Sequence, residues 1–96
     1  MEREHYTYTV DFSSLKDWRE IYPLVRKCME FPEYLGTNLD AIWDCLTDYV
    51  CYQNTITIKG IKSLSKSLQE DVTEIIDLFR EAEEKYPDRF EIRYED

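Results

Sequence analysis

Residues 31–50, FPEYLGTNLDAIWDCLTDYV, combine a turn with a helix that has two different faces. Pro32 and Gly36 break the chain, and Asn38 then stands where a helix N-cap is expected. At about 100° per residue, apolar side chains gather on one side of the next segment. They are Leu39, Ile42, Leu46 and Val50, flanked by Cys45 and Tyr49. We therefore predict a helix over residues 38–50 whose apolar side packs on the core.

The opposite side of this helix is acidic. It carries Asp40, Asp44, Thr47 and Asp48, and the first two lie one helical turn apart, where like charges repel. Trp43 falls on the border between the two sides. Trp43 has two interpretations. It is either an edge residue that closes the core, or an aromatic residue that anchors a partner beside two acids. The second arrangement is typical of contact surfaces.

The turn before the helix holds further candidates. Tyr34 precedes Gly36, and Gly36 permits a backbone conformation with positive φ. Ordinary turn chemistry accounts for both Gly36 and Asn38. The same turn would also hold the loop amides and the tip of the helix rigid beside Asp40 and Asp44, which is the functional interpretation.

Before this region, the sequence predicts a helix from about residue 14 to residue 29. Apolar side chains recur there at helical spacing, and Ser13 or Ser14 could cap the segment. Pro23 conflicts with an uninterrupted helix, because proline lacks the backbone N–H that the helix interior uses. It should therefore kink the segment or mark a later start.

After this region, the sequence predicts a helix over about residues 64–85. Its apolar stripe consists of Val72, Ile75, Ile76, Phe79 and Ala82. An interruption at Ser67 or Gln69 would divide the segment into a short helix and a long one. Pro87 should end it.

Strict alternation of apolar and polar residues predicts strands over residues 6–10, 55–58 and 90–94. In each strand only one side is consistently apolar. One face of the sheet should therefore be covered by other elements, and the other face should be more exposed to solvent. The strands are separated by long helical crossovers, which favour parallel pairing. We therefore predict an α/β fold, a small three-stranded parallel sheet packed by three to four helices, as a single domain over residues 1–96.

Charge limits the kinds of partner that the chain can bind. Twenty-one acids oppose twelve bases, for a formal charge of −9, and no Lys or Arg occurs from Cys28 to Ile58. This balance argues against nucleic acid or an anionic membrane as direct partner. A solvated acidic face that aids solubility is the simplest account of the basic-free stretch.

The cellular compartment is predicted to be the cytoplasm. The start of the chain, MEREHYTYTVDF, has no apolar stretch of signal-peptide length, and no stretch is long enough for a membrane span. Cys28, Cys45 and Cys51 are odd in number and lack metal-site spacing, so we expect reduced and mostly buried thiols.

The stretch from Phe31 to Val50 closely resembles the loop and second helix of the barstar family, inhibitors of secreted bacterial ribonucleases. A second match is LFREAEE, from Leu78 to Glu84. The resemblance implies an intracellular inhibitor without catalytic activity that binds the basic active site of a barnase-like ribonuclease. It also implies partner-binding residues at Tyr34, Gly36, Asn38, Leu39, Asp40, Trp43, Asp44, Thr47 and Glu81. Asp44 matches the carboxylate that stands in for a substrate phosphate.

Other residues depart from the family pattern around this contact surface: Leu35, Thr37, Asp48, Tyr49 and Cys51. The resemblance therefore implies a mode of binding and leaves the identity of the nuclease open.

Two alternatives from other functional classes stay open. One is a metal-dependent hydrolase that uses Asp40, Asp44 and Glu81, since hard cations accept carboxylate oxygens. However, His5 is the only histidine, and the sequence has no Gly-rich phosphate loop or nucleophile motif. The other is an acidic binding module or antitoxin for a basic nuclease or toxin of a different fold. We expect no cofactor and no bound metal, and we assume a monomer.

Overall fold

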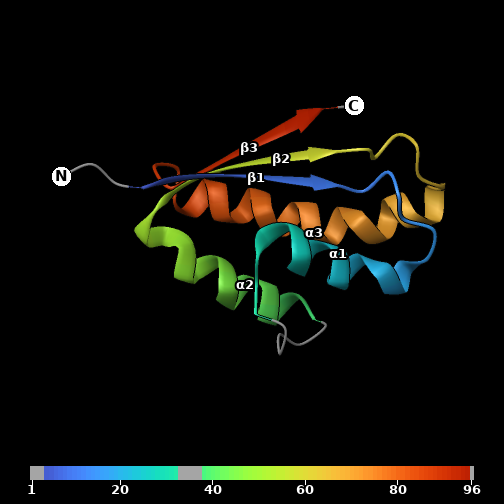
Figure 1. The fold of residues 1–96 in the computed structure, drawn as a ribbon, viewed down its shortest axis with the longest axis horizontal. Helices are drawn as coiled ribbons and strands as arrows, with labels where there is room; N and C mark the ends of the chain where they lie inside the picture. Colours follow the sequence, from blue (N-terminus) through green and yellow to red (C-terminus); the bar gives the residue numbers. More distant parts are fainter. Residues whose placement is uncertain (1–3, 33–37, 96) are drawn as a thin grey trace.

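The computed structural model of the protein describes residues 4–32 and 38–95. Within these ranges the chain forms a parallel three-stranded sheet in the order β1-β2-β3 (Figure 1). The strands are β1 (His5–Asp11), β2 (Gln53–Lys59) and β3 (Phe90–Glu95). The α-helices are α1 (Ile21–Met29), α2 (Leu39–Asp48) and α3 (Lys66–Lys85), with short 3-10 helices η1 (Trp18–Glu20) and η2 (Tyr49–Cys51). The predicted α/β class and parallel pairing are confirmed.

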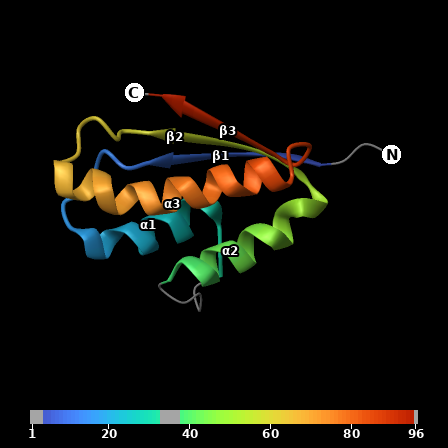
Figure 2. The same ribbon diagram turned by 180° about the vertical axis from the view of Figure 1, so that it is seen from behind.

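The α-helices of the described chain all lie on one face of the sheet, as both views show (Figures 1 and 2). Tyr8, Ile56 and Ile92 pair in register across the three strands and are buried under the helices. The opposite face is polar, as the alternation predicted. Thr55 and Thr57 belong to that face by alternation, yet are only 7% and 8% exposed, because β1 and β3 flank the middle strand on both sides.

The first helical segment begins later than residue 14, and neither Ser13 nor Ser14 caps it. Asp17 is the cap of η1: its carboxylate accepts a hydrogen bond from Arg19 N at 2.8 Å. Glu20 Oε1 accepts from Asp17 N at 3.0 Å, which completes a capping box. Pro23 then lies in the first turn of α1, where its missing N–H is tolerated. The alternative of a later start near Pro23 is therefore confirmed.

The last helix, α3, is continuous from Lys66 to Lys85, so the expected interruption at Ser67 or Gln69 does not occur. Ser65 caps the helix by accepting a hydrogen bond from Leu68 N at 3.3 Å. The Gln69 side chain donates to Leu64 O at 3.1 Å outside the helix, and so does not compete with the helical backbone. All members of the predicted stripe are buried: Val72, Ile75, Ile76, Phe79 and Ala82.

Two side chains, Tyr49 and Glu83, help to hold α2 and α3 in place. The Tyr49 hydroxyl, just after α2, donates to Met29 O at 2.6 Å, and its ring stacks on Tyr8 at a centroid distance of 5.8 Å. Burial raises the pKa of this phenol well above its usual value. From α3, Glu83 Oε2 accepts from Ile92 N at 2.9 Å and thus covers part of the free edge of β3.

Gly60, directly after β2, is expected to tolerate no side chain. Its φ is +80°, and a Cβ there would lie 2.5 Å from Ser13 N. We predict that Gly60→Ala lowers the free energy of unfolding by about 1–3 kcal/mol, because L residues are strained at this φ and a backbone atom must also move. Urea unfolding measures the change, with Ser67→Ala in the exposed first turn of α3 as control. Equal midpoints for Gly60→Ala and the unmodified protein would contradict the prediction.

Candidate functional site

The acidic side of α2 is exposed, as the sequence predicted. Asn38 caps the helix, with Oδ1 accepting from Ala41 N at 2.8 Å. Asp40 lies in the first turn, where the positive end of the helix dipole favours a carboxylate and offsets part of its repulsion with Asp44. Asp40, Asp44 and Asp48 are all exposed. The helix therefore presents a row of carboxylates to solvent.

The opposite, apolar side of α2 packs in the core. Ile42 and Leu46 are fully buried, at 0% exposure, while Leu39 is half-buried at the rim. Thr47 is also half-buried, and its hydroxyl donates to Asp44 O at 2.7 Å within the helix. Because the apolar side is anchored in this way, the carboxylates on the other side have a fixed backbone.

Trp43 borders the core, which confirms the first interpretation of its position, and its role as an aromatic anchor for a partner stays a prediction. The ring is half-buried and packs against the core, which is the structural role expected of an edge residue. A cation also lies over the ring: Lys85 Nζ, from the last turn of α3, is 5.7 Å from the ring centroid. A cation–π contact of this kind contributes about 0.5–1 kcal/mol when exposed. Sequence reasoning did not identify Lys85.

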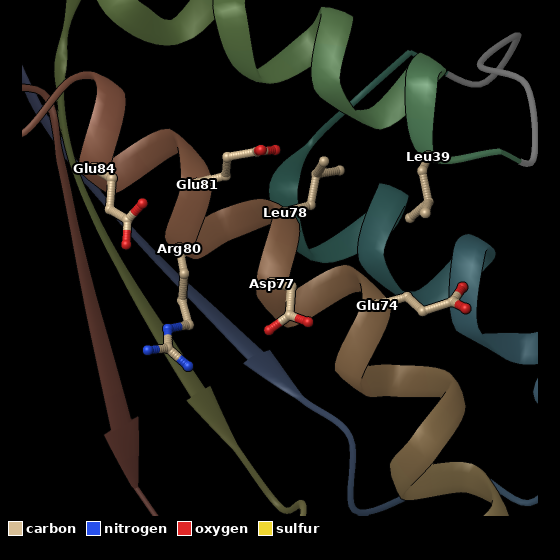
Figure 3. Close-up of a pocket in the computed structure, with 7 residues that line it drawn as sticks. All are labelled: Leu39, Glu74, Asp77, Leu78, Arg80, Glu81 and Glu84. Carbon is tan, nitrogen blue, oxygen red and sulfur yellow. The ribbon is translucent and has the colours of Figure 1, made fainter.

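A groove of about 660 Å³ lies between α2 and α3. Its lining residues are Leu39 from α2 and Glu74, Asp77, Leu78, Arg80, Glu81 and Glu84 from α3. Figure 3 shows Leu78 and Glu81 extending from α3 toward α2, and Leu39 extending from α2 into the space beside α3. The side chain of Arg80 points away from them. The groove is thus lined by two leucines, four acidic side chains and one arginine.

This groove brings Glu81 to the same side of the molecule as α2, although the two are far apart in sequence. Glu74, Asp77, Leu78 and Glu84 were not singled out as site residues from the sequence. Positions 74, 77, 78 and 81 follow helical spacing. Applying that period to the charged residues of α3, and not only to its apolar ones, would have found them.

The carboxylates of this face form no ion pairs in the described part of the chain. The ion pairs found there are Arg19–Asp17 and Arg93–Glu91, both on other elements. Neither Asp40 nor Asp44 pairs with a described basic side chain. We therefore expect a negative potential over α2 and the groove that attracts a basic partner.

Two predicted site residues, Tyr34 and Gly36, lie outside the described residues. The others are Asn38, Leu39, Asp40, Trp43, Asp44, Thr47 and Glu81, and all belong to α2, its cap or α3. What the structure adds is their common placement along α2 and the groove beside it.

The geometry gives the hydrolase alternative no support. Among residues 4–32 and 38–95, no group of three or more His, Cys, Asp or Glu side chains is arranged to hold a metal ion. His5 lies in β1, with Nε2 2.8 Å from Thr55 Oγ1, and not in the acidic face.

The cysteines are free, but the expectation that they are mostly buried is wrong. Cys28 and Cys45 are half-buried, and Cys51 is exposed in η2. Burial raises the pKa of the Cys45 thiol, as is usual for a thiol beside the core.

None of the described helices combines the length and the apolar character that a membrane crossing requires.

Comparisons with known proteins agree with the geometry. Residues 5–95 match the model of the family described as barstar (barnase inhibitor). The chain is also 36% identical over 64 residues to the Bacillus subtilis (strain 168) protein named "Putative ribonuclease inhibitor YrdF", an alignment that covers 67% of this chain and 70% of that protein. Because the family match spans nearly the whole chain, the protein belongs to the barstar family of ribonuclease inhibitors.

Proposed function

We propose that this protein inhibits a basic, barnase-like ribonuclease by covering its active site with the acidic side of α2, the loop before it and Glu81 of α3. The observation that carries the proposal is the exposed pair Asp40 and Asp44, which forms no ion pair with a described basic residue and lies on a helix anchored in the core. Membership of the barstar family and the name of the Bacillus subtilis relative support the same function.

The chemistry of the target explains why such a pair is useful. A ribonuclease site binds a polyanion, so it offers Arg, Lys and His side chains. Asp44 would occupy the position of a substrate phosphate and accept charge-assisted hydrogen bonds from these cations. Repulsion between Asp40 and Asp44 costs only a few tenths of a kcal/mol in the free protein, which such bonds in a desolvated cleft outweigh. The protein would thus act by binding in the cytoplasm, without catalysis of its own.

Association with the ribonuclease should be fast and should slow as salt rises. The reason is the formal charge of −9 together with the exposed acidic side of α2, whose field attracts a basic partner over distances at which salt screens it. The Debye length is ~10 Å at 0.1 M salt and shorter above it. Stopped-flow mixing with a barnase-like ribonuclease across a salt series measures the association rate constant.

The double variant Asp40→Asn, Asp44→Asn is the matched control, because it keeps side-chain size and removes the charges. It should associate more slowly and depend less on salt. An association rate that is indifferent to salt in the unmodified protein would contradict steering. If no ribonuclease is inhibited and another basic toxin is bound instead, the antitoxin alternative would replace this proposal.

A further inference from the structure

Lys85 places a positive charge at the end of α3, next to Trp43 and beside the acidic side of α2. Its ammonium lies 5.7 Å from the centroid of Trp43 and 5.6 Å from that of Tyr86. Glu81 stands one helical turn earlier, at the spacing that favours an ion pair, yet no such pair forms between them in the described chain. The Lys85 ammonium therefore contacts the rings of Trp43 and Tyr86 and is not paired with Glu81.

This placement changes what Trp43 can offer to a partner. The ring is half-buried and packs against the core, and the ammonium of the exposed Lys85 lies 5.7 Å from its centroid. A partner that aims an Arg or Lys at Trp43 would have to displace Lys85 and would meet a like charge. Juxtaposed like charges disfavour wrong partners, whereas an opposite charge at the same point is attracted.

We propose that Lys85 is a specificity-determining residue that requires a carboxylate on the partner surface facing Trp43. The inference rests on the proposed function, since it concerns one position in the contact with the ribonuclease. The cognate enzyme would then combine cations opposite Asp40 and Asp44 with an Asp or Glu at the rim that meets Lys85. Ribonucleases with a basic residue at that point would be excluded.

A purely structural role for Lys85 makes a different prediction. The residue lies in the last turn of α3, where a cation is favoured by the helix dipole. On that account, removing the charge would lower stability slightly and would affect binding to every ribonuclease equally. The structural role and the specificity role of Lys85 can be distinguished by comparing ribonuclease variants as partners and by reversing the charge at position 85.

The experiment measures dissociation constants of Lys85→Met, Lys85→Glu and Lys85→Arg with the cognate ribonuclease, alongside urea unfolding of each variant. We expect about tenfold weaker binding for Lys85→Met, about hundredfold for Lys85→Glu, and a change within about threefold for Lys85→Arg. Lys66→Met is the matched control. It makes the same change of net charge on an exposed lysine of α3, roughly 28 Å away along the helix, and should bind like the unmodified protein.

A charge-reversal scan of the Asp and Glu residues around the ribonuclease site completes the test. One reversal to Lys should restore binding to Lys85→Glu while weakening binding to the unmodified inhibitor. If Lys85→Met and Lys85→Glu bind as well as the unmodified protein while Asp44→Asn binds weakly, Lys85 has no such role and the proposed function stands. If the unmodified protein binds no ribonuclease, both proposals fall.

Discussion

Asp44→Ala should weaken ribonuclease binding by about 3–5 kcal/mol, or roughly a hundred- to several-thousand-fold in Kd. The carboxylate projects from the exposed side of α2, and the partner's cations would lose their counter-charge in a desolvated interface. Isothermal titration against the ribonuclease measures the loss. Stability should hold or rise slightly, because truncation opens no cavity and relieves repulsion with Asp40.

Asp48→Ala is the matched control for this variant. It removes the same charge from an exposed position of the same helix, at the end farther from the Asn38 cap. We expect a smaller loss of affinity, mainly through slower association. If Asp44→Ala binds like the unmodified protein, or if it unfolds the protein, Asp44 does not take the place of a phosphate. The acidic side of α2 would then be a solvated face.

Leu46→Ala should affect stability far more than binding, unlike Asp44→Ala. We expect a loss of about 2–5 kcal/mol in the free energy of unfolding. The side chain is 0% exposed and lies two positions from Asp44, on the side of α2 that packs in the core. Truncation removes buried apolar surface and leaves a cavity under the helix. Urea unfolding measures the loss.

Affinity for the ribonuclease should distinguish Leu46→Ala from Asp44→Ala. At a temperature where Leu46→Ala is still folded, its carboxylates remain in place, so affinity should fall far less than in Asp44→Ala. An unchanged unfolding midpoint would show that Leu46 is not a core residue of α2. A variant that is fully folded and yet binds as weakly as Asp44→Ala would show that the two sides of the helix do not have separate roles.

The positions of the main elements followed from the sequence because their signals are local. Alternation located the three strands, and helical spacing located α2 and the buried stripe of α3. Helix starts were harder to predict, because several polar residues compete for the same cap. Ser13, Ser14 and Asp17 can each cap a helix, and only Asp17 has Glu20 three residues later to complete the capping box.

Two other expectations, a buried Cys51 and a break at Gln69, were overturned by local structure. Cys51 follows the apolar side of α2 in sequence, but the chain tightens there into η2, and the thiol is exposed. Gln69 was a candidate for a break, but its side chain bonds outside the helix and α3 continues through it.

The sequence by itself determined the α/β class, the acidic side of α2 and the residues of its buried side. These depend on spacing between near neighbours, which the pitch of a helix or strand converts directly into faces. Only the tertiary structure decided that Glu81 and its neighbours on α3 line a groove with Leu39, and that Lys85 lies over Trp43. Those contacts join residues some forty positions apart, and their geometry depends on how two helices pack on a shared core, which no local pattern records.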